Sequence, residues 1–254
     1  MIEKELHIVD HLEELRKRII ISAVAFIVFL IVGFTFAIDI YKWFTKGIDM
    51  KLSVLGPSDI LWVYFMLATV IAIAGTIPVI AMQIWLFVRP ALRPKERKIT
   101  LTYVPALFFL FIMGLAFGYF IIFPMIFSFL LHLGQDMFIA QFTAEKYFQF
   151  LMNVTLPFGV LFELPVVVMF LTSLGILNPY VLSSIRKYAY FVLAVIAVVI
   201  TPPDFISDFI VTIPLFVLYE ISISLSKVVF RKKLKRQQKE ENERNVYEQG
   251  GAIK

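Results

Sequence analysis

The chain has 254 residues, of which 60% are hydrophobic and 17% are charged, with a formal net charge of +5 and a mean hydropathy of +0.85. Soluble domains are nearer half apolar and a quarter charged, so this composition predicts a polytopic membrane protein. Cysteine is absent, which excludes disulfides, thiol catalysis and thiolate metal sites. The positive net charge does not indicate nucleic-acid binding, because membrane proteins collect Lys and Arg on their cytoplasmic loops.

Six apolar segments are expected to cross the membrane as helices, which makes the predicted fold class all-α. The first four are close to or above the roughly 20 residues that a bilayer requires. The last two are shorter, and a helix of about 13 residues rises only about 20 Å against about 30 Å of hydrocarbon. The predicted spans are 19–38, 60–88, 99–123, 150–173, 188–200 and 209–224.

The distribution of basic residues predicts that both termini are cytoplasmic. Twenty of the 24 lysines and arginines lie in four alternate segments: the N-terminus, the second loop, the fourth loop and the C-terminal tail. This bias follows the positive-inside rule and requires an even number of spans. Residues 1–230 are expected to form one membrane domain. Residues 231–254 are basic and polar, with little to bury, which predicts a frayed helix or a disordered cytoplasmic tail.

Two glutamates precede the first span in the stretch HLEELRKRII. If a helix begins near Asp10, Glu13 sits where a capping box would place an acid. Glu14 and Arg18 are four residues apart, a spacing that favours an ion pair on one helix face. A capped, solvated helix explains Glu13 well and Glu14 less well, so a ligand-binding role for Glu14 stays open beside it.

The second loop contains RPALRPKERK, in which Glu96 is the only acid. One interpretation is a helix start after Pro94, with Glu96 in its first turn. The other is a second carboxylate at the same membrane surface as Glu14. Two such carboxylates would be suited to hold guanidinium groups in bidentate fashion.

Glu163 lies near the middle of the fourth predicted span, in PFGVLFELPV. An acid at that depth costs roughly 2.5–3.5 kcal/mol on insertion scales, so it should face protein or a wet cavity. The two interpretations are a neutral glutamate bonded to a neighbouring helix and a functional polar site within the membrane. Pro157, Gly159 and Pro165 predict a bent helix around it.

Enzyme motifs are absent from the sequence. It contains no HExxH, no GxSxG and no GxxxxGK[ST], and its three histidines form no metal-ligand spacing with an acid. We therefore expect neither an enzyme nor a bound cofactor or metal.

Five stretches together resemble one family. They are HLEELRKR, FVRPALRPKER, FGYFIIFP, PFGVLFELPV and TPPDFISD, in this order along a six-span chain. The chain is similar to the TatC family, the signal-peptide receptor subunit of the twin-arginine protein translocase. The resemblance implies six helices in a concave, glove-like bundle in the cell membrane. It also implies a receptor that binds twin-arginine signal peptides of folded precursors.

The same resemblance implies partners and site residues. Single-span subunits of the TatA/TatB type would be recruited for transport driven by the proton-motive force, and the receptor complex would contain several copies of this chain. The implied signal-peptide-binding residues are Glu14, Glu96, Arg16 and Phe87, and the implied intramembrane acid is Glu163. The implied docking site for the single-span partner comprises Val198, Thr201 and Asp208, although some family members carry Gln at the last position.

The sequence leaves two rival functions open. A proton-coupled secondary transporter or channel would use Glu163 as a relay acid, but it leaves the acids at the membrane surface unexplained. A passive membrane scaffold would bind no twin-arginine peptide.

Overall fold

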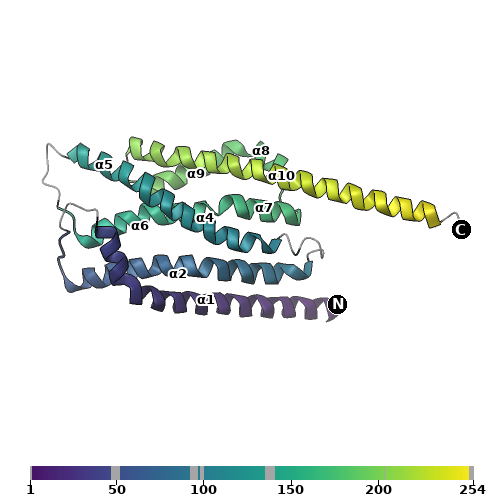
Figure 1. Ribbon diagram of the computed structural model, residues 1–254, viewed down its shortest axis with the longest axis horizontal. Helices are drawn as coiled ribbons and strands as arrows, with labels where there is room; N and C mark the ends of the chain where they lie inside the picture. Colours follow the sequence, from purple (N-terminus) through teal and green to yellow (C-terminus); the bar gives the residue numbers. More distant parts are fainter. Residues whose placement is uncertain are drawn as a thin grey trace.

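The computed structural model describes residues 2–46, 52–91, 97, 100–134, 141–202 and 204–251. Within these residues every regular element is a helix (Figure 1). Helix α1 spans Ile2–Thr45 and α2 spans Pro57–Val88, followed by the short 3-10 helix η1, Arg89–Ala91. The next membrane segment consists of α4 (Tyr103–Phe117), the π-helix η2 (Gly118–Ile122) and α5 (Phe123–Gly134).

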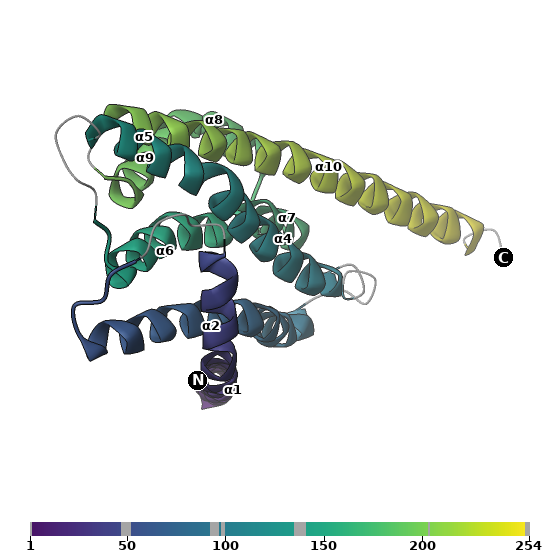
Figure 2. The ribbon, with the colours of Figure 1, turned by 60° about the vertical axis from the view of Figure 1, so that its left-hand side comes forward.

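The second half of the chain starts with two helices in line, α6 (Ala144–Leu161) and α7 (Leu164–Leu174). The short α8 (Pro179–Ser184) leads into α9 (Arg186–Ile200), and the chain ends with α10 (Phe205–Gly251). Helices α1 and α2 lie side by side at one edge of the molecule, and α10 lies at the other edge with α8 and α9 (Figures 1 and 2). Both chain ends lie toward the same end of the bundle (Figure 1).

Five segments of the described chain are long and apolar enough to cross a membrane. They are Leu12–Thr45, Pro57–Val88, Tyr103–Leu133, Ala144–Leu174 and Phe205–Lys235. Each overlaps one predicted span, and the third predicted span, 99–123, starts before Tyr103. The remaining predicted span, 188–200, corresponds to α9, which has 15 residues and is short as expected. The all-α prediction is therefore confirmed.

The last helix extends beyond the predicted sixth span on both sides. The predicted span, 209–224, lies within α10, which continues without a break for 47 residues, and the candidate membrane segment in this helix is Phe205–Lys235. The predicted frayed or disordered tail from residue 231 is helical as far as Gly251. Lys, Arg, Glu and Gln dominate this tail, and all four are good helix formers.

Packing against α7 also supports the continuation of α10. The Lys233 ammonium donates to the carbonyl of Ser173 at 2.9 Å, in the last turn of α7. A cation at that position interacts favourably with the unpaired carbonyls of a helix C-terminus. At the preceding residue of α7, the hydroxyls of Thr172 and Ser226 lie 2.7 Å apart, and both side chains are fully buried.

The capping role predicted for Glu13 is wrong, because α1 begins at Ile2 rather than near Asp10. Glu13 is instead an exposed residue within the helix. Its carboxylate lies 3.9 Å from the Arg16 guanidinium, and both side chains are at least 70% exposed. Exposed pairs of this kind contribute little to stability.

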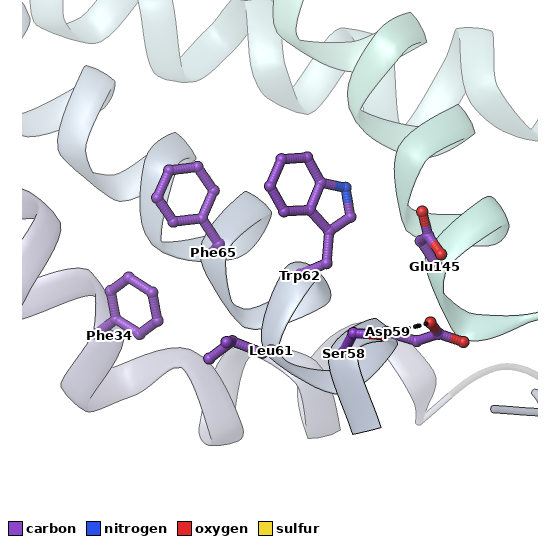
Figure 3. A pocket seen from close by; sticks show the side chains of 7 residues that line it. All are labelled: Phe34, Ser58, Asp59, Leu61, Trp62, Phe65 and Glu145. Carbon is purple, nitrogen blue, oxygen red and sulfur yellow. Dashed lines mark hydrogen bonds between the residues drawn. The ribbon is translucent and has the colours of Figure 1, made fainter. Parts of the chain in front are cut away.

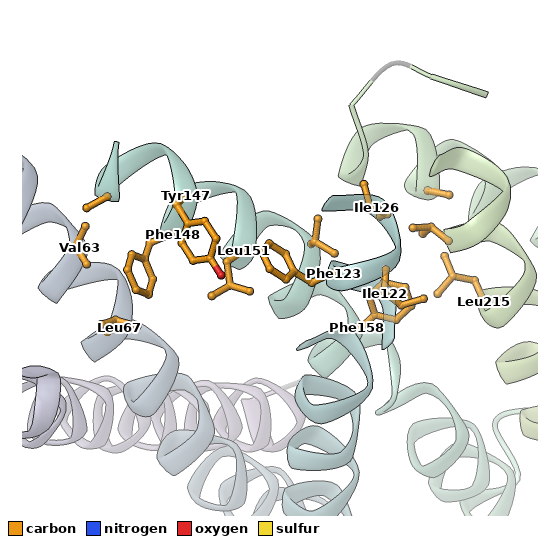
Figure 4. Close-up of a cluster of buried hydrophobic side chains, with 14 of the residues drawn as sticks. Val63, Leu67, Ile122, Phe123, Ile126, Tyr147, Phe148, Leu151, Phe158 and Leu215 are labelled. Carbon is orange, nitrogen blue, oxygen red and sulfur yellow. The ribbon is translucent and has the colours of Figure 1, made fainter. Parts of the chain in front are cut away.

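The apolar core lies where α6 meets α2, η2, α5, α9 and α10 (Figure 4). Phe148, Leu151 and Phe158 of α6 are fully buried at its centre. Glycines let the α4–α6 backbones approach each other: a Cβ at Gly114 would lie 2.5 Å from the Phe158 carbonyl oxygen. Small residues at helix interfaces are typical of membrane bundles, where close van der Waals packing replaces the hydrophobic drive.

Candidate functional site

Glu14 and Arg18 form an ion pair on α1, one helical turn apart. Arg18 Nη2 donates to Glu14 Oε1 at 2.6 Å, and Arg18 Nε donates to the same oxygen at 3.2 Å. The two side chains are 35% and 21% exposed, respectively, so water screens this pair less than it screens Glu13 and Arg16. The pair expected from the four-residue spacing is confirmed.

The Arg18 guanidinium also reaches the neighbouring helix. Its Nη1 donates to the side-chain oxygen of Gln83, on α2, at 3.0 Å. The two helices approach closely further along, where a Cβ at Gly33 would lie 2.7 Å from the Ala68 carbonyl oxygen. Gln83 was not predicted from the sequence. The sequence feature that could have indicated it is a single amide side chain within the apolar run VIAMQIWLFV.

Phe87 lies one turn beyond Gln83 on α2 and is partly buried. Between them, the buried Trp85 donates its indole N–H to Thr100 Oγ1 at 2.9 Å. The guanidinium of Arg89 lies over the Trp85 ring, 5.5 Å from its centroid. Trp85 therefore ties the end of α2 to Thr100, on the far side of the loop that contains Glu96.

Two predicted signal-peptide residues remain. Glu96 lies outside the described residues. Arg16 is described and is exposed on α1, where its guanidinium faces Glu13 rather than Glu14. The part of the predicted site that the structure describes is therefore the α1–α2 pair, where Glu14, Arg18 and Gln83 are joined and Phe87 follows one turn later.

Glu163 lies at a break within the fourth membrane segment. The turn at Phe162–Glu163 separates α6 from α7, and Pro165 follows in the first turn of α7. Proline lacks the N–H that would continue the helical ladder, which explains why the helix is interrupted there. The helix is therefore interrupted at Glu163, within the stretch where the sequence predicted a bend.

The Glu163 carboxyl group is buried without a hydrogen-bond partner among the described residues; neither of its oxygens is bonded. Burying such a group in apolar surroundings is costly unless another group satisfies it. The interpretation that a neighbouring helix bonds Glu163 has no support in this part of the chain. The carboxyl group remains able to accept or donate to a ligand.

The turn between α9 and α10 joins two of the three residues predicted to dock a partner. Thr201, at the end of α9, is hydrogen bonded to Asp208 of α10. Val198, one turn before Thr201, is half exposed. Asp204 caps α10 by accepting the Ser207 N–H at 2.7 Å, so capping accounts for this acid.

At the other end of α9, Glu220 holds two side chains. It accepts two bonds from Arg186, Nε to Oε1 at 2.7 Å and Nη2 to Oε2 at 2.9 Å. The Tyr190 hydroxyl donates to Oε1 at 2.6 Å. A bidentate guanidinium–carboxylate pair fixes geometry as well as charge. Glu220 thus fastens α9 to α10, a local structural role.

An open groove of about 460 Å³ lies between α1, the start of α2 and the start of α6 (Figure 3). Phe34, Trp62 and Phe65 form its apolar wall, and Asp59 and Glu145 lie at its edge. Asp59 accepts the backbone N–H groups of Leu55 and Gly56, which places it in the helix cap. None of the predicted site residues lines this groove. Among the described residues there is no group of three or more acids and histidines suited to a metal.

Comparison with known proteins gives one consistent result. Residues 10–214 match the family model for the Sec-independent protein translocase protein (TatC). The chain is 57% identical over 235 residues to TatCd of Bacillus subtilis strain 168, covering 92% of this chain and 97% of that protein. It is 46% identical over 232 residues to TatCy of the same strain, covering 90% and 91%.

Solved structures agree with the sequence comparisons. The crystal structure of a twin-arginine translocase receptor, TatC, superposes with a TM-score of 0.75 at 32% identity, covering 86% of this chain and 99% of that one. A second crystal structure of such a receptor, in the detergent DDM, gives a TM-score of 0.76 at 33% identity. These matches are all to protein translocase components, so they give no support to a proton-coupled transporter.

Proposed function

Since this chain belongs to the TatC family and is a core component of a twin-arginine translocase, we propose that it binds twin-arginine signal peptides through Glu14. The family consists of protein transport components rather than enzymes. The proposed ligand carries two adjacent arginines followed by an apolar segment. The proposed site lies at the end of the bundle that carries both chain termini, which we assign to the cytoplasm on the distribution of basic residues.

The observation that carries this proposal is the guanidinium already bound to Glu14. The carboxylate accepts two bonds from the guanidinium of Arg18, both on Oε1, so it already binds an arginine side chain in this setting. Glu14 is also partly exposed at the surface, where an arginine from a second chain has access. Charge-assisted bonds of this kind are among the stronger ones in proteins.

Three more residues complete the proposed contact. Glu96, from the basic loop after α2, supplies a second carboxylate for the second arginine of the signal. Arg16 and Phe87 contribute to the same surface, Phe87 by offering an aromatic ring to the apolar part of the peptide. The order of charge first and apolar surface second matches the order of the two parts in such a signal.

Glu163 is the proposed polar contact within the membrane. Its carboxyl group is buried and has no partner among the described residues, so an inserted signal peptide or a partner helix that offers a hydrogen bond would be stabilised there. Pro165, two residues later in the chain, has no backbone N–H to donate, so the helical hydrogen-bond ladder is incomplete at the same place.

The proposed partners are single-span subunits of the TatA/TatB type, docking on Val198, Thr201 and Asp208. The exposed Val198 offers apolar contact area to a helix. The Thr201–Asp208 pair beside it offers polar groups. We further propose that several copies of this chain assemble in the cell membrane and that the proton-motive force drives transport.

The test is export of a reporter carrying a twin-arginine signal from cells that depend on this chain. Glu14→Lys and Glu96→Lys, together, should abolish export, because each carboxylate that attracts an arginine becomes a cation that repels it. Glu13→Lys is the matched control, since Glu13 neighbours Glu14 but is highly exposed and weakly paired. Membrane levels of all variants should match the wild type. Normal export by the double variant would refute the carboxylate assignment.

A further inference from the structure

We propose that Arg18 is an internal stand-in for the signal peptide's arginine: it occupies Glu14 while the receptor is empty, and on binding it moves onto Gln83. This inference rests on the proposed function, in which Glu14 receives an arginine of the ligand. It adds two residues, Arg18 and Gln83, which the family resemblance did not indicate, and gives each a defined role in the exchange.

Arg18 occupies the carboxylate that the ligand's arginine would bind. Two of the three Arg18 guanidinium nitrogens, Nε and Nη2, are bonded to Glu14. A ligand arginine that binds the same carboxylate in fork geometry requires both carboxylate oxygens and the space that Arg18 now fills. The two guanidinium groups also repel each other. Binding therefore requires Arg18 to leave Glu14.

Gln83 offers the Arg18 guanidinium an alternative position. Nη1 of Arg18 is already bonded to the Gln83 side-chain oxygen at 3.0 Å, across the interface between α1 and α2. The amide oxygen is a neutral acceptor, so it can keep the guanidinium after the ion pair to Glu14 is broken. Gln83 is thus a positioning residue that acts through Arg18.

The shielding of Glu14 and Arg18 from water gives the reason for such an arrangement. Glu14 and Arg18 are both largely shielded from water at the edge of the membrane segment, being 35% and 21% exposed. An unpaired carboxylate there would be costly whenever no signal peptide is bound. Arg18 neutralises it in the empty state. Exchange of one arginine for another keeps the Glu14 carboxylate paired throughout, and the guanidinium left on the neutral Gln83 amide keeps the affinity moderate, so that the signal can be released.

The experiment measures binding of a fluorescent synthetic peptide, with paired arginines and an apolar segment, to the purified full-length chain in lipid nanodiscs. Arg18→Gln should raise the affinity about three- to tenfold, because a charge-assisted pair no longer has to be broken. Lys17→Gln removes the same charge one residue away and should change the affinity less than about twofold. An unchanged or lowered affinity in Arg18→Gln would overturn the inference.

Gln83→Leu supplies a second test that does not depend on the first variant. It removes the position to which Arg18 moves, so the peptide should bind a few-fold more weakly. In the Arg18→Gln background the same change should have no effect, because no guanidinium remains to be held. An equal loss in both backgrounds would show that Gln83 acts by itself and would contradict the exchange.

The failure of this inference can be told apart from failure of the proposed function. If Glu14→Gln does not weaken binding, or if a peptide with paired lysines binds as well as one with paired arginines, the Glu14 assignment itself is wrong. The Glu14 assignment stands if Glu14→Gln weakens binding and the wild type prefers paired arginines to paired lysines. If Arg18→Gln and Gln83→Leu then leave the peptide affinity unchanged, the exchange is wrong. Thermal unfolding of each variant checks that it is folded.

Discussion

The buried hydroxyl pair between α7 and α10 predicts an asymmetric response to substitution. Thr172 Oγ1 lies 2.7 Å from the Val168 carbonyl oxygen and 2.7 Å from Ser226 Oγ. A hydroxyl has one proton, so Thr172 donates to the carbonyl and accepts from Ser226. Removing the serine hydroxyl leaves Thr172 satisfied. Removing the threonine hydroxyl leaves the Ser226 hydroxyl buried without this acceptor.

The two losses should therefore differ in size. Ser226→Ala removes one neutral hydrogen bond and should lower the free energy of unfolding by about 1 kcal/mol. Thr172→Val keeps the shape of the side chain but leaves a buried donor unsatisfied, which should cost about 2 kcal/mol. The double variant removes both groups together and should lie within about 1 kcal/mol of the wild type, since replacing both partners is nearly neutral.

The assay is reversible unfolding of the purified chain in mixed micelles, followed by the helical signal in circular dichroism. Ser224→Ala is the matched control, because the Ser224 hydroxyl is exposed and bonds only to the Glu220 carbonyl of its own helix. It should change the unfolding free energy by less than about 0.5 kcal/mol. Equal losses in the two single variants, or a double variant that shows their sum, would refute this reasoning.

Three further predictions concern the other helix contacts. Glu220→Gln should lower the midpoint of thermal unfolding in detergent, because one substitution weakens bonds to both Arg186 and Tyr190; an unchanged midpoint would contradict the fastening role of Glu220. Asp208→Leu should reduce co-purification of a single-span partner at least severalfold while leaving peptide binding intact, and undiminished co-purification would contradict the docking site. Gly114→Leu should prevent stable folding, measured as loss of the monodisperse species in size-exclusion chromatography, because the new side chain would meet the α6 backbone; a normal elution profile would contradict the close helix contact.

Much of the fold followed from the sequence because the bilayer imposes a simple requirement on it. Backbone groups in lipid must be satisfied within their own segment, so apolar runs of sufficient length become helices. Each expected span overlaps one or more helices. The helix ends were harder to predict. No start or stop signal in the sequence marks where α1 begins at Ile2 or where α10 ends at Gly251, and the α10 extension is polar and depends on helix propensity.

Local site chemistry was predictable where it depended on spacing along one helix. The Glu14–Arg18 pair followed from a separation of four residues and is present. The role of Gln83 was not predictable, because it depends on how α1 and α2 align across 65 residues of sequence. The bonds of Arg186 and Tyr190 to Glu220 escaped prediction for the same reason.

The role of Glu163, the intramembrane acid, was partly predictable from the sequence. Its cost in an apolar span drew attention to Glu163 from the sequence alone. The sequence could not decide whether a neighbouring helix satisfied it. The described residues offer it no partner, which is why it is proposed to meet a group from another chain.

Site-specific photo-crosslinking tests the central claim most directly. A photoreactive residue placed at position 14, 96 or 163 of the full chain would be illuminated in membranes in the presence of a radiolabelled precursor with a twin-arginine signal. Positions 14 and 96 are predicted to crosslink to the paired-arginine region and position 163 to the apolar segment, while position 13 gives little product. Crosslinks at 13 as strong as those at 14, or unchanged by replacing the paired arginines with lysines, would contradict recognition at Glu14.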